Sequence, residues 1–373
     1  LPLFLEDLKN GKVRRIYQTT QFADLQKTPI PLWNILDMKK YEAMNIQYSR
    51  GCPFNCDFCN VTTLFGHQPR VKSADQVIAE LDSLYVSGWR GGVFFVDDNL
   101  IGNKKALKNE LLPALTAWNH GKHDLSFNTQ VSINLADDEA LMRSMVEAGF
   151  NMIFVGIETT DESSLDECNK KQNLKRDLVA DVQKLQRAGL QVQGGFIVGF
   201  DHDTPSTFQK VGSFIQKSGI VTAMVGLLQA PPGTPLFKRL EKVGRILTDN
   251  SGNNTDGSTN VVPLMNVDLL HREYKQLMQY LYSPKVYYER VKTFLTNYHP
   301  PKLNLHLDFK SARAYVHAFL RSIVQLGIFG KERWEYWKLF FWSLFRRPQV
   351  FFLAIVFSIY GYHFRRVSET IQG

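Results

Sequence analysis

Short runs of β-branched and aromatic residues alternate with longer helical segments between about residues 41 and 228 of this 373-residue chain. This alternation is typical of βαβ units, in which each helix carries the chain back so that the next strand runs parallel to the last. Six segments are predicted to be strands: 45–48, 92–96, 125–131, 152–157, 192–198 and 223–228. We therefore expect an α/β fold with an open or partial six-stranded barrel.

The helices between these strands have recognisable ends. Ser73 and Gln76 have the capping-box spacing at the start of one helix, and another helix follows Asp137. A glycine follows the last apolar position of four helical segments, at Gly88, Gly149, Gly189 and Gly219. Glycine at this place commonly ends a helix, so the pattern supports the predicted order of elements.

Parallel α/β proteins bind ligands at the carboxyl ends of their strands. The cysteine-containing segment follows the first predicted strand. The ends of the other five strands carry polar residues or turn formers, namely Asp97, Asp98, Asn99, Asn128, Gln130, Ser132, Glu158, Gly199, Asp203 and residues 231–235. We expect a ligand site at this edge of the sheet, although glycine, proline and carboxylates also serve as ordinary turn and cap residues.

Three of the four cysteines, Cys52, Cys56 and Cys59, lie in the segment Arg50-Gly-Cys-Pro-Phe-Asn-Cys-Asp-Phe-Cys-Asn60. Thiolates this close on one loop can ligate three irons of a four-iron cluster. The fourth iron then keeps open positions for a ligand. The alternatives are a zinc site, with His67 as a possible fourth ligand, and cysteines without a metal role.

The cysteine distribution is a poor pattern for a disulfide framework and fits a reducing, cytoplasmic setting. Cys168 lies far from the other three. It is predicted to be an ordinary, partly buried cysteine, with a catalytic thiol as the alternative.

With its three-then-two cysteine spacing and Phe58 before the last cysteine, the chain resembles the radical S-adenosylmethionine superfamily over about residues 41–235. The resemblance implies a six-stranded partial barrel and a [4Fe–4S] cluster on Cys52, Cys56 and Cys59. It further implies that S-adenosylmethionine binds the open iron and is cleaved to a 5′-deoxyadenosyl radical. The chain is then an enzyme that takes electrons from a donor such as flavodoxin or ferredoxin.

The same resemblance implies cofactor contacts at several strand ends. Gly91-Gly92 with Asp97-Asp98-Asn99 corresponds to the family's Gly-Gly-Glu type motif, with the acid displaced along the chain. The segment ending at Gly199 resembles the family's strand-five motif, and Pro232 lies in a Pro-Gly-Thr-Pro turn like that found after strand six. The cofactor-binding candidates are Phe58, Asp97, Asp98, Asn128, Glu158, Gly199 and Pro232.

The two ends of the chain resemble a subgroup linked to a cobalamin-binding domain, which includes the hopanoid methylases. Residues 1–40 are similar to the helix and linker that leave the cobalamin domain, residues 41–262 form the radical core, and residues 263–373 form a helical domain. No cobalamin motif lies in this sequence, so the resemblance alone implies that cofactor. It implies methylation of an unactivated carbon of a lipid or small molecule. An oxidoreductase or ring-forming enzyme, and a non-catalytic metal-binding module, are the alternatives.

The formal charge of +8 is concentrated at the C-terminal end, where residues 302–373 hold eleven Lys or Arg and four Asp or Glu. Trp, Phe and Tyr lie among these charges, as in segments that contact a membrane surface, and we expect no nucleic-acid partner. Residues 350–362 are strongly apolar but shorter than the ~20 residues that span a bilayer. A contact with the inner face of the membrane and a buried helix that covers the barrel are both consistent with this pattern. Residues 248–260 are polar and predicted to form a surface loop.

Overall fold

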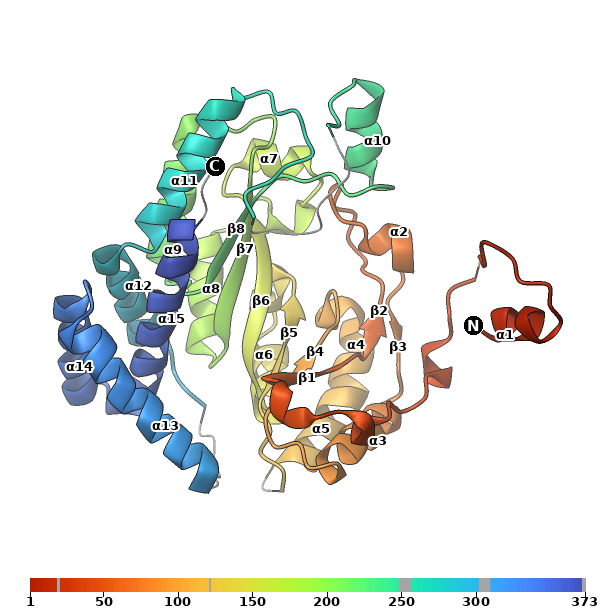
Figure 1. Ribbon diagram of the computed structural model, residues 1–373, viewed down its shortest axis with the longest axis horizontal. Coiled ribbons are helices and arrows are strands. Elements are labelled where there is room, and N and C mark those ends of the chain that lie inside the picture. Colours follow the sequence, from red (N-terminus) through yellow and green to blue (C-terminus); the bar gives the residue numbers. More distant parts are fainter. Residues whose placement is uncertain (19–20, 121, 248–255, 302–308, 371–373) are drawn as a thin grey trace.

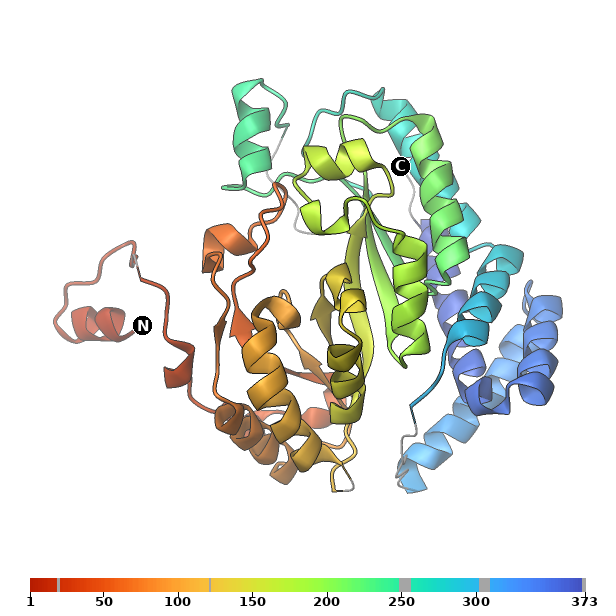
Figure 2. The same ribbon diagram turned by 180° about the vertical axis from the view of Figure 1, so that it is seen from behind.

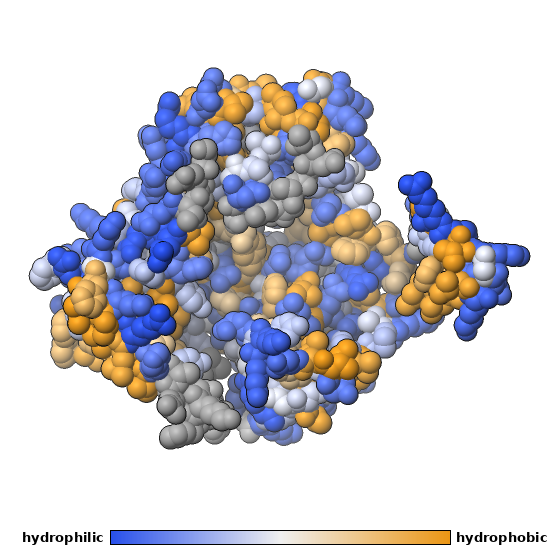
Figure 3. Space-filling model, viewed as in Figure 1, coloured by the Kyte–Doolittle hydropathy of each residue, from blue (hydrophilic) through white to orange (hydrophobic). Residues whose placement is uncertain are grey.

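A computed structural model describes residues 1–18, 21–120, 122–247, 256–301 and 309–370. Its centre is a parallel six-stranded sheet with the strand order β1-β4-β5-β6-β7-β8, which follows the chain without reversal. The helices that connect the strands cover one face of this open barrel (Figure 2), and the opposite face lines a hollow that Figure 3 shows open. The predicted α/β partial barrel is confirmed.

The six strands coincide with the six predicted segments to within a few residues. They are β1 (Ala43–Ile46), β4 (Gly92–Phe95), β5 (Phe127–Val131), β6 (Phe150–Glu158), β7 (Gln191–Val198) and β8 (Ala223–Leu227). The first strand begins and ends two residues earlier than predicted. Alternate residues of each strand are buried against the covering helices, and this shared packing fixes the register.

A two-stranded antiparallel ribbon, which the sequence pattern did not predict, encloses the cysteine segment. It pairs β2 (Ser49–Arg50) with β3 (Arg70–Val71). The three cysteines and the short helix α2 (Val61–Phe65) lie between these two strands along the chain. The ribbon therefore returns the chain close to the point where the cysteine segment leaves the sheet.

The helices around the barrel have the predicted capping. Ser73 and Gln76 form the expected capping box at the start of α3, and α6 and α9 end at left-handed Gly149 and Gly219. The helical elements of this region are α3 (Ala74–Val86), α4 (Lys104–Ala106), the π-helical η5 (Leu107–Leu111), α5 (Leu112–Asn119), α6 (Glu139–Ala148), α7 (Glu162–Glu167), α8 (Leu178–Arg187), α9 (Pro205–Ser218) and α10 (Pro235–Lys242).

Helices are the only regular secondary structure in the described part of the chain beyond residue 263. They are α11 (Val267–Leu281), α12 (Pro284–Asn297), α13 (Phe309–Ser322) with its π-helical continuation η8 (Ile323–Ile328), α14 (Arg333–Arg346) and α15 (Phe351–Thr370), with a 3-10 turn, η9 (Pro348–Val350), before the last. They stand beside β8 and α9 (Figure 1) and share one hydrophobic core with the barrel. Most of the predicted 248–260 loop lies outside the described residues.

Helix α15 is longer than the apolar run noted in the sequence. Together with the preceding turn, Pro348–Glu369 is the one helix of the described residues that is long and apolar enough to cross a membrane, and a third of its most apolar stretch is buried. Ala354 and Phe357 are fully buried, and Tyr287 of α12 donates a hydrogen bond to the carbonyl of Phe357 at 2.8 Å. Helix α15 is thus packed as a core helix of the C-terminal region.

The N-terminal segment extends away from the barrel (Figure 1). It consists of α1 (Pro2–Lys9) and a chain with short 3-10 turns at Leu25–Lys27, Trp33–Ile35 and Met38–Lys40. Among residues 1–18 and 21–40 no other helix or strand is present, as the prediction of one helix followed by a linker required.

Candidate active site

The cysteine segment leaves the ribbon through a glycine that its backbone requires. Gly51 has a φ of +100°, and a Cβ at this position would lie 2.8 Å from the carbonyl oxygen of Gln68. The amide of Cys52 donates to the carbonyl of Gly66 at 3.3 Å. A side chain at residue 51 would therefore push the first cysteine away from the returning strand.

Asp97, which follows β4, holds the start of the cysteine segment. One carboxylate oxygen accepts the amide N–H of Tyr48 at 3.1 Å, and the other accepts the amide N–H of Ser49. Burial raises the pKa of this fully buried carboxyl to about 6, while the hydrogen bonds from Ser49 and Tyr48 act in the opposite direction. Asp97 thus fixes the backbone two residues before Gly51.

The far side of the cysteine segment is held by residues that follow β6 and β8. The amide of Asp57 donates to the carbonyl of Cys168 at 3.0 Å, and the side chain of Asn169 donates to the carbonyl of Asn55 at 2.8 Å. The amide of Leu236 donates to the carbonyl of Asp57 at 3.0 Å. The loop is therefore bound to opposite sides of the barrel.

The three cysteines line one cavity of about 180 Å³ at the carboxyl ends of β4, β5 and β6. Other residues that line it include Phe58, Asp98, Asn99, Gln130, Ser132, Glu158, Lys170 and Gln172. Asn99 and Ser132 are joined by hydrogen bonds of 3.2 and 3.3 Å. One carboxylate oxygen of Asp98 and the side-chain amide oxygen of Gln172 are buried and have no partner among the described atoms. Such acceptors fit a ligand that carries an ammonium or hydroxyl group.

The donor set fits a polynuclear iron cluster better than a single metal ion. Within the described part of the chain, no three His, Cys, Asp or Glu side chains converge on one point where an ion could bind. The three thiols nevertheless share one cavity, as ligands of separate irons would. Burial raises the pKa of the Cys52 thiol and raises that of Cys59 to about 11, so iron binding must displace protons from them.

Glu158 lies at the end of β6, where the strand departs from regular geometry. The register with β7 shifts between Gly156 and Glu158, and Glu158 has a φ of +66°, which is uncommon for a residue with a side chain. Its carboxylate accepts a hydrogen bond from the Lys170 ammonium at 2.7 Å. A Cβ at residue 156 would meet the Glu158 carboxylate and the Lys170 ammonium, so a side chain there would displace this ion pair.

Lys170 and Gln172 join the cluster cavity from the segment after α7. Burial opposes the charge of Lys170, but the Glu158 carboxylate together with Cys56 and Cys168 outweighs burial, and the pKa of the ammonium is raised. The ammonium lies 5.9 Å from the centre of the Phe58 ring. The side-chain amide of Gln172 donates to the sulfur of Cys56 at 3.6 Å.

A second, larger cavity of about 570 Å³ adjoins the first. Phe58, Cys59, Phe154 and Glu158 line both of them. The second cavity also has an apolar wall from the last strands and the turn after β8, formed by Phe196, Ile197, Met224, Leu227, Pro231 and Pro232. A molecule bound there would lie directly beside the cysteine cavity.

The structure brings together only part of the predicted cofactor set. Phe58, Asp98 and Glu158 line the cysteine cavity, and Pro232 lines the second cavity with Phe58 and Glu158. Asn128 lies on β5 two residues before Gln130, on the same face but deeper in the barrel, and lines neither cavity.

Two predicted cofactor contacts line neither cavity. Asp97 is fully buried and uses both oxygens on backbone amides of the chain, so it positions the cysteine segment. Gly199 has a φ of +102° and faces Leu270 and Leu228, in a turn whose amides bond to Asp203. Both belong to loops that shape the site without lining either cavity.

Cys168 takes no part in either cavity. Its side chain is buried among Phe200, Leu228 and other apolar residues, and burial raises its pKa to about 12. It packs as an ordinary buried cysteine.

Sequence reasoning missed Lys170, Gln172 and Phe154. Lys170 and Gln172 follow a short helix and have no periodic pattern, while Phe154 resembles any core residue of a strand. For Lys170 and Gln172, the only sequence signal of a role in the site was their position shortly after the strand that ends in Glu158.

The fold and the cavity of three cysteines define a radical S-adenosylmethionine enzyme, and the comparisons agree. A sequence model of the radical SAM superfamily matches residues 46–215, and one described as a domain of unknown function (DUF4070) matches residues 234–373. This chain belongs to the radical SAM superfamily. Members of the family use a [4Fe–4S] cluster and S-adenosylmethionine, which the donor set described above fits.

Two related proteins are named as a methyltransferase and a methylase. An uncharacterised methyltransferase of Synechocystis sp. is 36% identical over 100% of this chain and 69% of its own length. The hopanoid C-2 methylase of Rhodopseudomonas palustris is 34% identical over 89% of this chain and 63% of its own length. The chain thus spans about two thirds of these relatives.

Two solved structures share the fold. The cobalamin-dependent S-adenosylmethionine radical enzyme OxsB, with aqua-cobalamin and S-adenosylmethionine bound, aligns over 98% of this chain and 62% of its own, with a TM-score of 0.56 and 13% identity. The methyltransferase TsrM of Kitasatospora setae, with cobalamin and a [4Fe–4S] cluster bound, aligns over 86% of this chain and 61% of its own, with a TM-score of 0.50 and 18% identity.

Proposed function

We propose that this chain methylates an unactivated carbon of an apolar, lipid-like substrate, using a radical formed from S-adenosylmethionine at the cysteine segment. The observation that carries this proposal is the pair of adjoining cavities. The smaller contains the three thiols, and the larger has an apolar wall and shares Phe58, Phe154 and Glu158 with it.

The [4Fe–4S] cluster, when bound, supplies the electron that cleaves S-adenosylmethionine. Cys52, Cys56 and Cys59 would hold it, with Asp98 and Gln172 offering unpartnered oxygens to polar groups of the cofactor. The Lys170–Glu158 pair would keep a fixed positive and negative charge at the junction of the two cavities. The aromatic rings of Phe58 and Phe154 would exclude water from the path between them.

The apolar wall supports an apolar substrate because a binding site selects its ligand by burial of matching surface. A hydrocarbon carbon cannot be activated by proton transfer at neutral pH, so a radical is a suitable means to modify it. The hopanoid C-2 methylase among the relatives supports this substrate class. Cobalamin as methyl carrier is proposed from the names of the solved relatives.

The proposal includes a protein partner and a membrane contact. A flavodoxin or ferredoxin would supply electrons, as the radical chemistry requires a reductant. The chain would act in the cytoplasm at the inner face of the membrane, with the basic and aromatic C-terminal helices toward the lipid.

The test is anaerobic reconstitution with iron and sulfide, followed by reduction and incubation with a lipid extract, hydroxocobalamin and S-adenosylmethionine carrying a ¹³C-methyl group. We expect 5′-deoxyadenosine and a ¹³C-labelled lipid. Cys52→Ala should abolish both, whereas the matched control Cys168→Ala, which alters a thiol outside both cavities, should retain them.

Other results would redirect the assignment. Deoxyadenosine with an altered but unlabelled lipid would favour a radical oxidoreductase or ring-forming enzyme. Equal activity of Cys52→Ala and the wild-type chain would overturn the proposed cluster site.

A further inference from the structure

The C-terminal helices expose an unusual amount of apolar surface. On α13 and its continuation η8, the exposed side chains Val316, Leu320, Val324 and Ile328 recur every four residues. This spacing places them along one side of the helix. Figure 3 shows apolar surface gathered over α13 and α14.

The neighbouring helix α14 adds exposed aromatic rings. Trp334, Phe341 and Phe345 follow one another at seven and four residues, and 70%, 49% and 76% of their surface is exposed. Their spacing also corresponds to one helical face. We call the exposed residues Val316, Leu320, Val324, Ile328, Phe329, Trp334, Phe341 and Phe345 the C-terminal apolar face.

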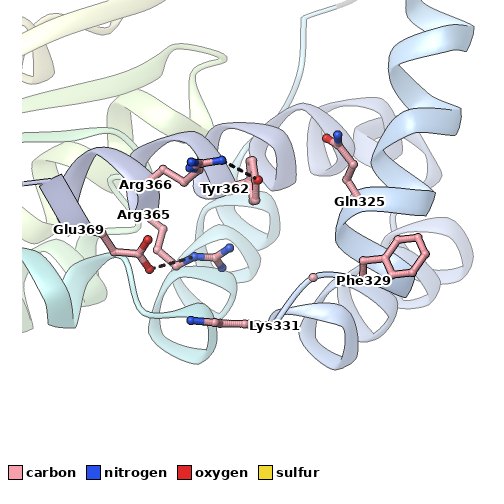
Figure 4. A pocket seen from close by; sticks show the side chains of 8 residues that line it. Gln325, Phe329, Lys331, Tyr362, Arg365, Arg366 and Glu369 are labelled. Carbon is pink, nitrogen blue, oxygen red and sulfur yellow. Dashed lines mark hydrogen bonds and ion pairs between the residues drawn. The ribbon is translucent and has the colours of Figure 1, made fainter.

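A cavity of about 380 Å³ opens beside this face. Tyr362, Arg365, Arg366 and Glu369 of α15 line it, together with Gln325 of η8 and Phe329, which follows η8 (Figure 4). Gly330 and Lys331, in the turn between η8 and α14, complete the lining. Phe329, which is 78% exposed, belongs both to the cavity and to the C-terminal apolar face.

The cations of this cavity are not equivalent. Arg365 is already neutralised, because its guanidinium donates to the buried carboxylate of Glu332 at 2.8 and 3.2 Å. Arg366 donates to the hydroxyl of Tyr362 at 3.3 Å. Within the described residues, neither Arg366 nor Lys331 forms an ion pair with a carboxylate. Two exposed cations and a tyrosine hydroxyl are therefore available to an anion.

We propose that the C-terminal apolar face docks on an anionic membrane surface and that the cavity beside it binds the phosphate of a lipid headgroup through Lys331 and Arg366. The inference deepens the proposed function and rests on its membrane contact. Apolar and aromatic side chains would enter the interface between headgroups and acyl chains, and the two cations would lie at headgroup level.

Charge favours a membrane over a second copy of this chain. Residues 309–370 carry ten Lys or Arg and three Glu. Two copies that met through this region would bring together two surfaces of the same sign, which is unfavourable. An anionic bilayer has the opposite sign and attracts basic segments by about 1 kcal/mol per Lys or Arg near its surface.

The C-terminal apolar face and the apolar helix α15 are separate features. The exposed residues lie on α13, η8 and α14, whereas Ala354 and Phe357 of α15 are fully buried under α12 and its neighbours. Docking would therefore need no unfolding of α15. The outer helices alone would contact lipid.

The experiment measures binding of the full chain to sedimented vesicles, either of phosphatidylcholine alone or with one third phosphatidylglycerol. We expect tighter binding to the anionic vesicles. The double variant Lys331→Gln/Arg366→Gln should weaken that binding about 27-fold, since two charges are lost. The matched control Arg143→Gln, which removes one exposed charge on α6, should leave it within about fivefold.

A second pair tests the apolar face. Trp334→Ser/Phe345→Ser should reduce binding to both kinds of vesicle. The control Val86→Ser/Val243→Ser, at exposed apolar residues at the end of α3 and just after α10, should not. All four positions are exposed, so each variant should retain its fold, which circular dichroism would check. Competition by inorganic phosphate at constant ionic strength would reveal a site for the free anion.

Several outcomes would overturn the inference. The first two are equal vesicle binding by all variants and equal binding to neutral and anionic vesicles. The third is displacement of the chain from the vesicles by millimolar inorganic phosphate, which would indicate a site for the free anion. The fourth is a change from dimer to monomer in Trp334→Ser/Phe345→Ser, which would indicate an interface between two copies of the chain. None of these readings requires catalysis. A chain that binds vesicles but transfers no methyl group would contradict the proposed reaction and leave the docking surface standing. A chain that transfers methyl groups but does not bind vesicles would overturn the docking surface and leave the proposed reaction standing.

Discussion

At the scale of single residues, Gln172 is the side chain that most directly links the barrel to a proposed iron ligand. Its amide donates to the sulfur of Cys56, and its oxygen is buried without a partner among the described atoms. Hydrogen bonds to the sulfurs of an iron–sulfur cluster raise its reduction potential, because they stabilise the more negative, reduced state.

We predict that Gln172→Leu lowers the reduction potential of the reconstituted cluster by tens of millivolts, on the order of what a hydrogen bond of about 1 kcal/mol contributes. The measurement is a potentiometric titration followed by electron paramagnetic resonance. Gln183→Leu on α8, whose side chain bonds to the carbonyl of Lys217 outside both cavities, is the matched control. An unchanged potential in Gln172→Leu would contradict the prediction.

Asp203 is a buried carboxyl that should make stability depend on pH. It accepts hydrogen bonds from the amides of Gly199 and Phe200 and from the hydroxyl of Ser164. Burial nevertheless raises its pKa to about 6, above the value of about 3.9 in an unfolded chain. Between these values the folded state binds the proton more tightly, so the stability that Asp203 contributes falls as pH rises from 4 to 6.

In Asp203→Asn this pH dependence should disappear, because asparagine keeps an acceptor for the two amides and carries no charge. We expect the wild-type chain to lose about 2 kcal/mol relative to the variant between pH 4 and pH 7. Urea unfolding of the iron-free proteins at several pH values measures this difference. Parallel stability profiles for the two proteins would show that the carboxyl titrates at an ordinary pKa.

At the scale of elements, the cysteine segment is a long loop whose shape is imposed from outside. The ribbon of β2 and β3 holds its two ends, Asp97 holds its entry, and Asn169 and the carbonyl of Cys168 hold its middle. A loop bound at several points loses little conformational entropy when the metal binds.

Asp97→Asn should disturb this loop, since an amide group in place of one carboxylate oxygen would direct an N–H at the backbone N–H of Tyr48 or Ser49. A buried donor without an acceptor costs about 1–3 kcal/mol. We expect less iron per chain after reconstitution and a lower free energy of unfolding. Asp75→Asn, at an exposed position of α3, is the control and should behave as the wild type. Full iron content in Asp97→Asn would show that the loop does not depend on this contact.

The order of elements could be predicted from the sequence, whereas the contacts between loops could not. The strands and the capped helices have local signals, in the alternation along β5 and in Ser73 and Gly149. The ribbon of β2 and β3 was missed because strands of two residues are too short to show an alternation of polar and apolar side chains. The bonds from backbone amides to Asp97 could not be predicted, because a carboxylate that bonds to an amide 48 residues earlier has the same sequence signature as one that faces a ligand.

At the scale of the whole molecule, the C-terminal helices complete the open barrel. The parallel strand β8 lies at the edge of the sheet and, within the described residues, pairs only with β7. The carbonyl of Thr222 accepts the amide of Gly194, so by alternation the carbonyls of Ala223 and Val225 point away from β7. Tyr282, which follows α11, and Tyr274 of α11 donate their hydroxyls to these two carbonyls at 2.7 and 3.0 Å.

These hydroxyls bond to groups that an open edge would leave unpaired, and both tyrosines are buried. We therefore predict that Tyr274→Phe/Tyr282→Phe lowers the free energy of unfolding by about 2–4 kcal/mol, since each change leaves a buried carbonyl without a donor. Tyr280→Phe, on the same helix but half-exposed, is the control and should change it little. The quantity to measure is the urea midpoint of the iron-free chain.

The same experiment tests whether the barrel and the C-terminal helices unfold together. One hydrophobic core extends from Met44 of β1 to Phe357 of α15, so the wild-type chain should unfold in one transition by both circular dichroism and tryptophan fluorescence. Trp334, Trp337 and Trp342 report on the C-terminal helices, and Trp89 and Trp118 report on the barrel. Two separate transitions in the wild-type chain, the earlier with a loss of helical circular dichroism, would mean that the edge of β8 remains folded without its tyrosine partners, and the barrel would then stand as an independent unit.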